Sequence, residues 1–401
     1  MSAEFINEIF MKSGSLEYLK ILDFSTLLPR PYATLALSDL EADTLRVVSG
    51  SRPDLVALMP PFLPGTEISA NLAWLVRGKC SITLNLKKHQ AVTIVKQLIL
   101  ISEYDIILEQ FRPGVMDKLG LGYEHLKKIN PGLIYCSLTG YGQDGPYSKR
   151  AGHDINYLAR SGLMSYSGTK ADGPALTGMQ IADVASGSNN VIIGILAAVL
   201  FQNNTGNGQH IDISMMDGVV PFNAMTGAGA IIYGLDPERE GELLNGGSHY
   251  EFYETKDGQY ISFGGLEPQF FSAFCHTIGC PDLIEGGVMP KDIDQVKARV
   301  RKIIKTKTRD KWEESFKNVD ACVEPVLTLS EALNDPHVIH RGLVFDVELS
   351  DGCSVRQFGT PIQFSETPLH YSKAGQPAGA DNKEVLLKLG YSDEEIEDLF
   401  E

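Results

Sequence analysis

The sequence predicts an α/β fold with a doubly wound parallel sheet and a second, smaller α+β domain. Over the first 140 residues, short apolar runs alternate with helical patterns, which is the rhythm of strands joined by crossover helices. From about residue 235 the pattern changes to aromatic-rich runs that flank an Asp-Gly turn. The length of 401 residues leaves room for two or three domains.

Each element of the large domain follows from a local pattern. Strand candidates are short and apolar, and they cover residues 18–24, 44–48, 80–86, 104–109, 133–138 and 209–215. Helical periodicity covers residues 31–40, 89–101, 123–128, 151–164 and 183–202. Because strands and helices alternate, we expect helices on both faces of one parallel sheet.

The smaller domain is predicted for residues 235–335. Two runs that flank Asp257-Gly258 indicate a β-hairpin. Helical segments follow near residues 268–279, 291–305 and 309–317. Residues 336–401 contain a hairpin around Asp351-Gly352 and helices near 383–390 and 393–400. We expect them to return to the large domain, whose first part is residues 1–234.

Charge disfavours several classes of partner. Asp and Glu total 51 against 35 Lys and Arg, so the formal net charge is −16. That field repels phosphate backbones and anionic lipid, so neither a nucleic-acid nor a membrane partner is expected. A phosphorylated ligand therefore needs a local basic pocket. The longest apolar stretch, residues 191–201, has about half the length of a membrane span and is predicted to be a buried helix.

The two ends of the chain lead to the expectation of a cytoplasmic protein. Residues 1–12 include Glu4 and Glu8 and lack the apolar core of a signal peptide. Residues 398–401 do not match the peroxisomal ending.

Cofactor and metal patterns are not found. The six cysteines are scattered without a C-x-x-C pair and are expected to be reduced and buried. Cys275, His276 and Cys280 are better explained by an amphipathic helix than by a metal site. Residues 25–31, after the first strand candidate, contain no glycine, which argues against a nicotinamide cofactor. P-loop and G-x-S-x-G patterns are also missing, so ATP hydrolysis and serine hydrolysis have no support.

Three residues are candidates for acid–base chemistry, and each has a structural alternative. His153 opens a predicted helix, whose free N–H groups favour a neutral imidazole; the alternative is a capping or surface histidine. Asp183 begins the most apolar helix, where desolvation would raise a carboxyl pKa; the alternative is an ordinary N-cap. Glu267 precedes Pro268 at a helix start, where it either favours the helix dipole or hydrogen-bonds a histidine from another segment.

Six motifs occur in an order and spacing that together are specific. They are residues 110–115 (QFRPGV), 119–122 (LGLG), 138–146 (LTGYGQDGP), 151–157 (AGHDINY), 265–270 (GLEPQF) and 320–326 (DACVEPV). Over residues 18–345 the chain resembles the family III CoA-transferases and, within that family, its α-methylacyl-CoA racemase branch.

The resemblance implies a Rossmann-like large domain and an interlocked homodimer, with each active site between the large domain of one chain and the small domain of the other. It implies acyl-CoA thioester substrates and no metal or organic prosthetic group, because CoA is part of the substrate. His153 and Asp183 match the two opposed bases of the family, and Glu267 matches the partner of the histidine. Asp183 also matches the aspartate nucleophile of the transferases, whereas His153 distinguishes the racemase branch.

The implied reaction interconverts (R)- and (S)-2-methylacyl-CoA. Epimerisation removes an α-proton from one face of the carbon and returns one to the other, so two bases must flank it. We expect His153 to serve the S face and Asp183 the R face, with N–H groups at the head of the Asp183 helix near the enolate oxygen. The alternatives are a CoA-transferase that uses Asp183 as nucleophile and a CoA-binding protein without activity.

By family position a set of polar and apolar residues lines the CoA site. These are Asn85, Leu86, Lys87, Gln110, Phe111, Arg112, Lys118, Gly152, Asp154, Asn156 and Tyr157. Lys87, Arg112 and Lys118 are expected to meet phosphates, with a solvated surface position as the alternative for the two lysines.

Three positions depart from the family pattern. Arg30 stands in a turn that usually reads Gly-Pro-Gly-Pro. Ser49 replaces a basic residue, for which Arg46 and Arg52 are candidate substitutes. Ala182 replaces the glycine that usually precedes the aspartate.

Overall fold

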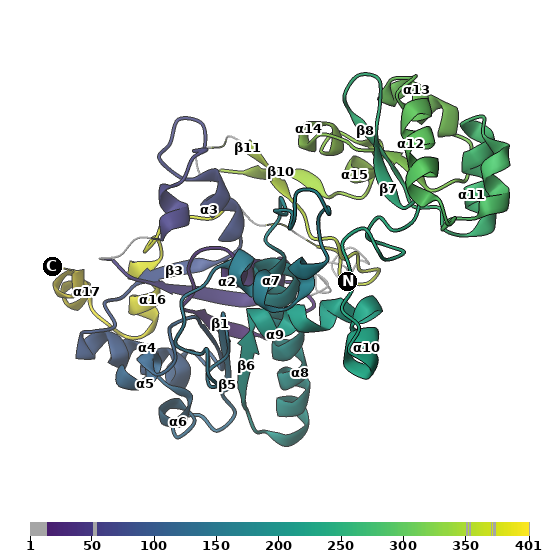
Figure 1. Cartoon of the computed structure of the whole chain (residues 1–401). Helices are drawn as coiled ribbons and strands as arrows, with labels where there is room; N and C mark the ends of the chain where they lie inside the picture. Colours follow the sequence, from purple (N-terminus) through teal and green to yellow (C-terminus); the bar gives the residue numbers. More distant parts are fainter. Residues whose placement is uncertain are drawn as a thin grey trace. The chain divides into compact units, whose positions relative to one another are not determined.

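The computed structural model describes residues 14–50, 54–349, 352, 354–369, 371 and 374–400 (Figure 1). The chain divides into two compact units. The large unit comprises the residues up to Leu158, Met179–Val219 and the chain from His337 onwards. The small unit comprises Ala159–Gly178 and Val220–Pro336.

The large unit is built on a six-stranded parallel sheet with the strand order β3-β2-β1-β4-β5-β6. The strands are β1 (Lys20–Asp23), β2 (Asp43–Val48), β3 (Cys80–Thr83), β4 (Ile106–Glu109), β5 (Ile134–Thr139) and β6 (His210–Ser214). This order is that of a Rossmann fold, so the predicted doubly wound sheet is confirmed. The order reverses between β1 and β4, which is therefore the topological switch point.

Helices pack against the sheet, some of them as crossovers between strands, and a large buried core lies between helices and sheet. The helices are η1 (Leu55–Leu58), α2 (Pro29–Asp39), α3 (Ala70–Leu75), α4 (His89–Ile101), α5 (Val115–Lys118), α6 (Tyr123–Leu126), α7 (Asp154–Arg160), η3 (Ile181–Ser188), α8 (Asn189–Thr205), α9 (Met215–Val219), α15 (Pro336–His340), α16 (Asn382–Lys388) and α17 (Asp393–Phe400). α4 shows why the pattern folds this way. Its Ile94, Val95 and Leu98 recur at helical spacing and are buried against Leu22 and Leu45 of the sheet.

The C-terminal residues complete the large unit. Leu386 of α16 is fully buried in the core beneath α4. The Asp381 carboxylate accepts a hydrogen bond from Ser81 N–H at 2.7 Å, and the Asn382 side-chain oxygen accepts one from Thr83 N–H at 2.8 Å. Because β3 is an edge strand, these bonds satisfy donors that no neighbouring strand can reach.

An antiparallel hairpin, β10 (Val344–Glu348) with β11 (Ser354–Phe358), also belongs to the large unit. The turn was predicted at Asp351-Gly352, and Asp351 lies outside the described residues. Buried Arg77 anchors the hairpin. Its guanidinium donates to the Gln357 side chain at 2.9 Å and forms an ion pair with Asp39 of α2 at 2.7 Å.

The continuous helix Ile181–Thr205, formed by η3 and α8, is long and apolar enough to cross a membrane by length and composition alone. Core helices of soluble proteins have the same properties. Here Val191, Ile195 and Val199 are buried, and α8 packs against α2 and β5. On the opposite side, the side chains of Ile193 and Leu200 are 63% and 66% exposed.

The small unit contains a three-stranded antiparallel sheet in the order β7-β8-β9. Its elements are η2 (Leu163–Ser165), η4 (Val220–Asn223), α10 (Ala224–Tyr233), β7 (Glu251–Glu254), β8 (Tyr260–Phe263), α11 (Pro268–Thr277), η5 (Pro281–Gly286), α12 (Ile293–Ile304), α13 (Arg309–Phe316), β9 (Val323–Pro325) and α14 (Leu329–Ala332). The predicted Asp-Gly hairpin forms β7 and β8. Phe263 and Phe274 stack at 3.9 Å between ring centroids in its core, beside the buried Trp312.

Long-range hydrogen bonds assign residues 159–178 and 220–234 to the small unit, whereas the sequence pattern grouped them with the large domain. The Tyr166 hydroxyl donates to the Asn223 side chain at 2.9 Å. Arg239 Nε donates to Ser167 O at 3.0 Å, and Asn245 donates to Tyr166 O at 3.2 Å. These contacts join segments more than 50 residues apart, which local periodicity does not reveal.

The described cysteines are free thiols. Cys136, Cys275 and Cys280 are buried as expected, whereas Cys80 and Cys322 are exposed, so the expectation was wrong for those two. Cys80 begins an edge strand and Cys322 lies in a loop.

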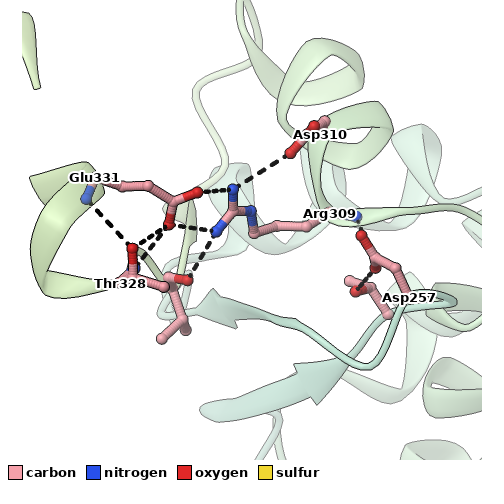
Figure 2. Close-up of polar contacts among 7 residues, drawn as sticks. Asp257, Arg309, Asp310, Thr328 and Glu331 are labelled. Carbon is pink, nitrogen blue, oxygen red and sulfur yellow. Dashed lines mark hydrogen bonds and ion pairs between the residues drawn. The ribbon is translucent and has the colours of Figure 1, made fainter.

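A charged cluster links α13 to α14 in the small unit (Figure 2). The Arg309 guanidinium makes two hydrogen bonds with the Glu331 carboxylate, at 2.6 and 2.9 Å. Glu331 also accepts from Thr328 N–H and Oγ, which completes a capping box at the start of α14. The Asp257 carboxylate accepts from Arg309 N–H at 3.2 Å. Arg309 lowers the pKa of Glu331 to about 2.

We expect Glu331→Gln to destabilise the small unit at neutral pH. Because its pKa is lowered in the folded state, Glu331 contributes stability above the ordinary Glu pKa, and this contribution is lost as pH falls from about 4.5 towards 2. Urea unfolding followed by the fluorescence of Trp312 should show a lower midpoint for the variant at about pH 7 and a smaller difference near pH 3.

Glu384→Gln is the matched control, because Glu384 forms an exposed i,i+4 pair with Lys388 on α16. Exposed pairs of this kind contribute little, so its midpoint should stay close to that of the wild type. An equal loss in both variants would contradict the role of the Arg309 cluster.

Candidate active site

The candidate residues of the large unit gather at the carboxyl edge of the parallel sheet. Asn85, Leu86 and Lys87 follow β3, and Gln110, Phe111 and Arg112 follow β4. Ligands of doubly wound sheets bind at this edge, beside the switch point. Strand order therefore places these two groups on one edge, although they are 25 residues apart in sequence.

The exposure of these residues differs. Asn85, Lys87, Arg112 and Lys118 are exposed, so three cations are accessible for phosphate groups. Leu86 and Phe111 are half-buried and pack against the main core. Lys87 and Arg112 therefore each follow directly on a residue that is packed against the core.

A pocket of about 130 Å³ lies next to Arg112. Buried Glu109 forms one wall, and its carboxylate accepts a hydrogen bond from Phe111 N–H at 2.7 Å, which fixes the turn that carries Arg112. Burial raises the pKa of Glu109. The His210 ring forms another wall, where it stacks on Tyr123 at 5.5 Å between centroids.

Of the two candidate substitutes for the missing basic residue, the structure describes Arg46, and it is buried. Arg46 is 2% exposed, and its burial lowers the pKa of the guanidinium. It lies near Asp23 and Asp54 inside the unit, so the proposal that Arg46 meets CoA is wrong for this conformation. Arg52 lies outside the described residues.

His153 directly precedes α7 and is exposed. Its N–H donates to the Asn156 side-chain oxygen at 3.0 Å, and its carbonyl accepts from Asn156 N–H at 2.8 Å. Tyr157 is buried, and its hydroxyl donates to Gly152 O at 2.6 Å. Residues 152–157 therefore form a closed turn whose backbone is fixed while the imidazole stays accessible.

Asp183 lies on η3, a π-helical turn at the head of α8. Such turns are rare and often occur at functional sites. One oxygen of the Asp154 carboxylate accepts hydrogen bonds from Ala182 N–H at 2.6 Å and Asp183 N–H at 3.0 Å. N–H groups at the head of this helix were expected near an enolate oxygen, and the amides of Ala182 and Asp183 are bound to Asp154 instead.

The Asp183 carboxyl is half-buried, and burial raises its pKa to about 6. That value includes a smaller rise caused by the negative charge of Asp154, and it is limited by the charges of Arg30 and His153, which lower the pKa. The predicted candidates His153 and Asp183 are thus brought within electrostatic reach of each other. A carboxyl group with a pKa near neutrality can both accept and return a proton.

Arg30, the departure from the usual turn, lies in the first turn of α2 and is 6% exposed. Its Nη1 donates to the Gln110 side chain and its Nη2 to Leu138 O. Burial lowers the pKa of Arg30 to about 10. The sequence marked this residue as unusual but did not indicate that it lies near Asp183.

Glu267 lies in the small unit. It occupies the N-cap position of α11, its side chain makes no capping hydrogen bond, and it is exposed. Pro268 follows it as the first helical residue, as the sequence predicted. The Glu267 carboxylate lies close enough to Cys322 to contribute to the raised pKa of that thiol.

Strand order defines a doubly wound α/β fold, and the candidate residues follow the carboxyl ends of its strands. Residues 16–382 match the model of CoA-transferase family III, and the chain belongs to this family.

Relatives with two different activities are similar to it. α-Methylacyl-CoA racemase of Homo sapiens is 32% identical over 385 residues, covering 95% of each chain. Succinate–glutarate CoA-transferase of Agrobacterium fabrum is 33% identical over 387 residues, covering 93% of this chain and 95% of the relative. A CAIB/BAIF family protein of Brucella suis has a similar structure, with a TM-score of 0.82, 28% identity, and coverage of 94% of this chain and all of the other.

We expect Asp183→Asn to stabilise the protein at alkaline pH. Because the folded state holds the Asp183 carboxylate less well than the unfolded chain does, ionisation destabilises the fold above about pH 6. Removal of the charge should raise the free energy of unfolding by about 1–2 kcal/mol near pH 8, after allowance for partial exposure. The gain should shrink as pH falls below about 6 and vanish near pH 3, where the proton is bound in both states.

Urea unfolding at both pH values measures this difference. Asp217→Asn on α9 serves as the control, because Asp217 is exposed. A loss of stability in Asp183→Asn at alkaline pH would show that the carboxylate is stabilised by its surroundings, contrary to the prediction.

Proposed function

We propose that the protein is a racemase that interconverts (R)- and (S)-2-methylacyl-CoA thioesters. The observation that carries the proposal is the pairing of accessible His153 with half-buried Asp183, whose pKa is about 6, on one edge of the sheet. Two groups that exchange protons near neutrality are what α-proton abstraction and return require. The similarity to a relative that is named α-methylacyl-CoA racemase also supports the proposal.

In this mechanism the two bases share one proton. Starting from the R epimer, the Asp183 carboxylate removes the α-proton and the electron pair of the C–H bond moves into the thioester as an enolate. Protonated His153 then delivers its proton to the opposite face of the carbon. The reverse reaction begins with neutral His153 and protonated Asp183, so no proton is gained or lost overall.

Substrate binding uses the edge residues. We assign Lys87, Arg112 and Lys118 to the phosphates of CoA, because they are exposed cations in a chain of net charge −16. Asn85, Leu86, Gln110 and Phe111 follow the same strand ends. Gly152, Asp154, Asn156 and Tyr157 form the turn at His153, next to the reacting thioester. CoA enters as part of the substrate, and the mechanism uses no other cofactor.

A homodimer is part of the proposal. α10 is apolar, and it has no buried residue within its ten positions. Ile231, Ile232 and Tyr233 are 86%, 67% and 75% exposed. Apolar surface of this kind is usually covered by a partner. An interlocked second chain would cover it and bring its Glu267 to His153. We place this dimer in the cytoplasm, with neither nucleic acid nor membrane as a partner.

A CoA-transferase is the alternative, favoured by the transferase relative at 33% identity. In that reaction the Asp183 carboxylate attacks the thioester carbonyl, CoA leaves as the thiolate, and an acyl-aspartyl anhydride forms. The thiolate attacks the anhydride to give an aspartyl-CoA thioester and the free carboxylate. The first carboxylate departs, and a second carboxylate attacks the aspartyl-CoA carbonyl, which expels the CoA thiolate and forms a new mixed anhydride. The thiolate then attacks the acyl carbonyl of this anhydride, which releases the new acyl-CoA and restores the Asp183 carboxylate. This route requires Asp183 but not His153.

Deuterium exchange at the α-carbon separates these reactions. In D₂O, the enzyme should incorporate deuterium into a 2-methylacyl-CoA from either epimer, as measured by NMR. Asp183→Asn should reduce exchange from the R epimer, and His153→Gln exchange from the S epimer, by at least about 100-fold, because a general base contributes on that scale. Both variants should lose interconversion of the epimers. His125→Gln is a matched control, because His125 is exposed on α6.

Three other outcomes are informative. Acyl transfer to an added carboxylate, retained in His153→Gln and without α-exchange, would replace the racemase with the transferase. CoA binding with neither reaction would leave a binding protein. Exchange that survives both substitutions would exclude the two-base mechanism.

Self-association has its own test. Sedimentation equilibrium should give twice the chain mass of 43.9 kDa for the wild type. Ile231→Glu combined with Ile232→Glu should shift the mass towards the monomer, because two carboxylates would have to be buried at the interface. Leu100→Glu, at a position 59% exposed on α4, should remain dimeric. A monomeric wild type would refute the dimer.

A further inference from the structure

Arg30 is a buried cation that the proposed mechanism does not use. It follows β1 at the switch point between β1 and β4, and its guanidinium donates to Gln110 after β4 and to Leu138 O of β5. Gln110, its partner after β4, donates in turn to Thr26 Oγ after β1. Arg30 Nε has no hydrogen-bond partner among the described residues. Two hydrogen bonds and an unsatisfied donor are an expensive arrangement for a role in packing alone.

The turn that carries Arg30 is tied to the backbone of Asp183. The Ser188 hydroxyl contacts Pro29 O, the residue before Arg30, and also lies 3.1 Å from Asp183 O. α2 packs against both η3 and α8. A cation in the first turn of α2 is therefore held in a fixed position relative to η3.

The charges around Asp183 come from three elements. Asp154 at the start of α7 opposes ionisation, whereas His153 beside it and Arg30 of α2 favour it. Asp217 lies on α9, which also packs against η3, and α8 carries no charged residue. Of the groups that favour the carboxylate, Arg30 alone keeps its charge throughout the working pH range, because His153 must gain and lose a proton in turnover.

Arg30 also interacts with other acidic groups. Glu109 of β4, Tyr157 of α7 and Asp23 of β1 surround it together with Asp183. Glu109 is bound to Phe111 N–H, and Asp23 is bound to Thr34 Oγ and Ser25 N–H. Asp183 differs from these two because no hydrogen bond from a side chain fixes its carboxylate in the described part of the chain.

We propose that Arg30 is a positioning residue whose buried charge keeps the Asp183 carboxylate ionised against burial and the charge of Asp154. The inference rests on the proposed catalytic role of Asp183 but holds for either reaction, because racemisation from the R epimer and acyl transfer both begin with the Asp183 carboxylate. With a neutral residue at position 30, such as the glycine usual in the family, other groups would have to stabilise the carboxylate.

The direct test is the titration of Asp183 itself. Protein labelled with [γ-¹³C]aspartate gives one carboxyl resonance per residue, and Asp183→Asn assigns the resonance of interest. In Arg30→Met and Arg30→Gln the titration midpoint should rise by about one pH unit, the lower end of the effect of a neighbouring charge. Arg30→Lys keeps the charge and should remain near the wild type. Asp154→Asn should move the midpoint down.

Two neutral variants are included because Arg30→Met removes every polar contact, whereas Arg30→Gln keeps a donor for Leu138 O. An unchanged midpoint in a folded neutral variant would overturn the proposal. So would a shift in Arg30→Lys as large as that in Arg30→Gln, because the effect would then come from shape and not from charge.

The activity readout is the acid limb of the pH profile of kcat/KM. This limb should move to higher pH with the midpoint in Arg30→Gln, and Arg30→Lys should restore it. The two hypotheses fail separately. A shifted midpoint in a protein without α-exchange or acyl transfer would refute the proposed function and keep the role of Arg30. An active enzyme in which the Asp183 titration midpoint does not shift would refute only the proposed role of Arg30.

Discussion

The Asp154 carboxylate joins α7 to η3, because one of its oxygens accepts hydrogen bonds from both Ala182 and Asp183 N–H. Those amides belong to the head of a helix, where a negative charge is stabilised by unpaired donors. The same contact fixes the position of His153 relative to the Asp183 carboxyl. The rest of the candidate site depends on it, because His153 and Asp183 lie on the two elements that it connects.

This contact places a negative charge beside a carboxyl that is already half-buried. Elsewhere in the large unit a buried carboxylate, that of Asp23, lies close to a buried cation, Lys79. Lys79 donates to Pro31 O at 2.8 Å and to Thr34 Oγ at 2.7 Å, and it lies 3.9 Å from Asp23. Burial lowers the pKa of Lys79 to about 7. The first turns of α2 therefore rest on a polar layer, and their position is fixed by hydrogen bonds more than by apolar packing.

Much of the fold follows from the sequence. Alternating apolar runs predicted the parallel sheet, and the Asp-Gly turn predicted the hairpin of β7 and β8. The division between the units was less accessible, because Arg239 and Ser167 meet only after folding. The site shows the same limit. His153 and Asp183 were found by their positions at predicted helix starts. The hydrogen bonds from the η3 amides to Asp154 join residues 28 and 29 apart, and local pattern does not reveal them.

The edge of β3 is completed by Asp381 and Asn382, which are near the end of the chain. During synthesis on the ribosome, almost 300 residues must emerge after β3 before its outer donors are satisfied. Most of the small unit lies within that interval, as the continuous segment Val220–Pro336. Its contacts are more local, and local contacts form sooner. The nascent chain therefore holds an open strand edge until the last helices arrive, and this interval is when chaperones would matter most.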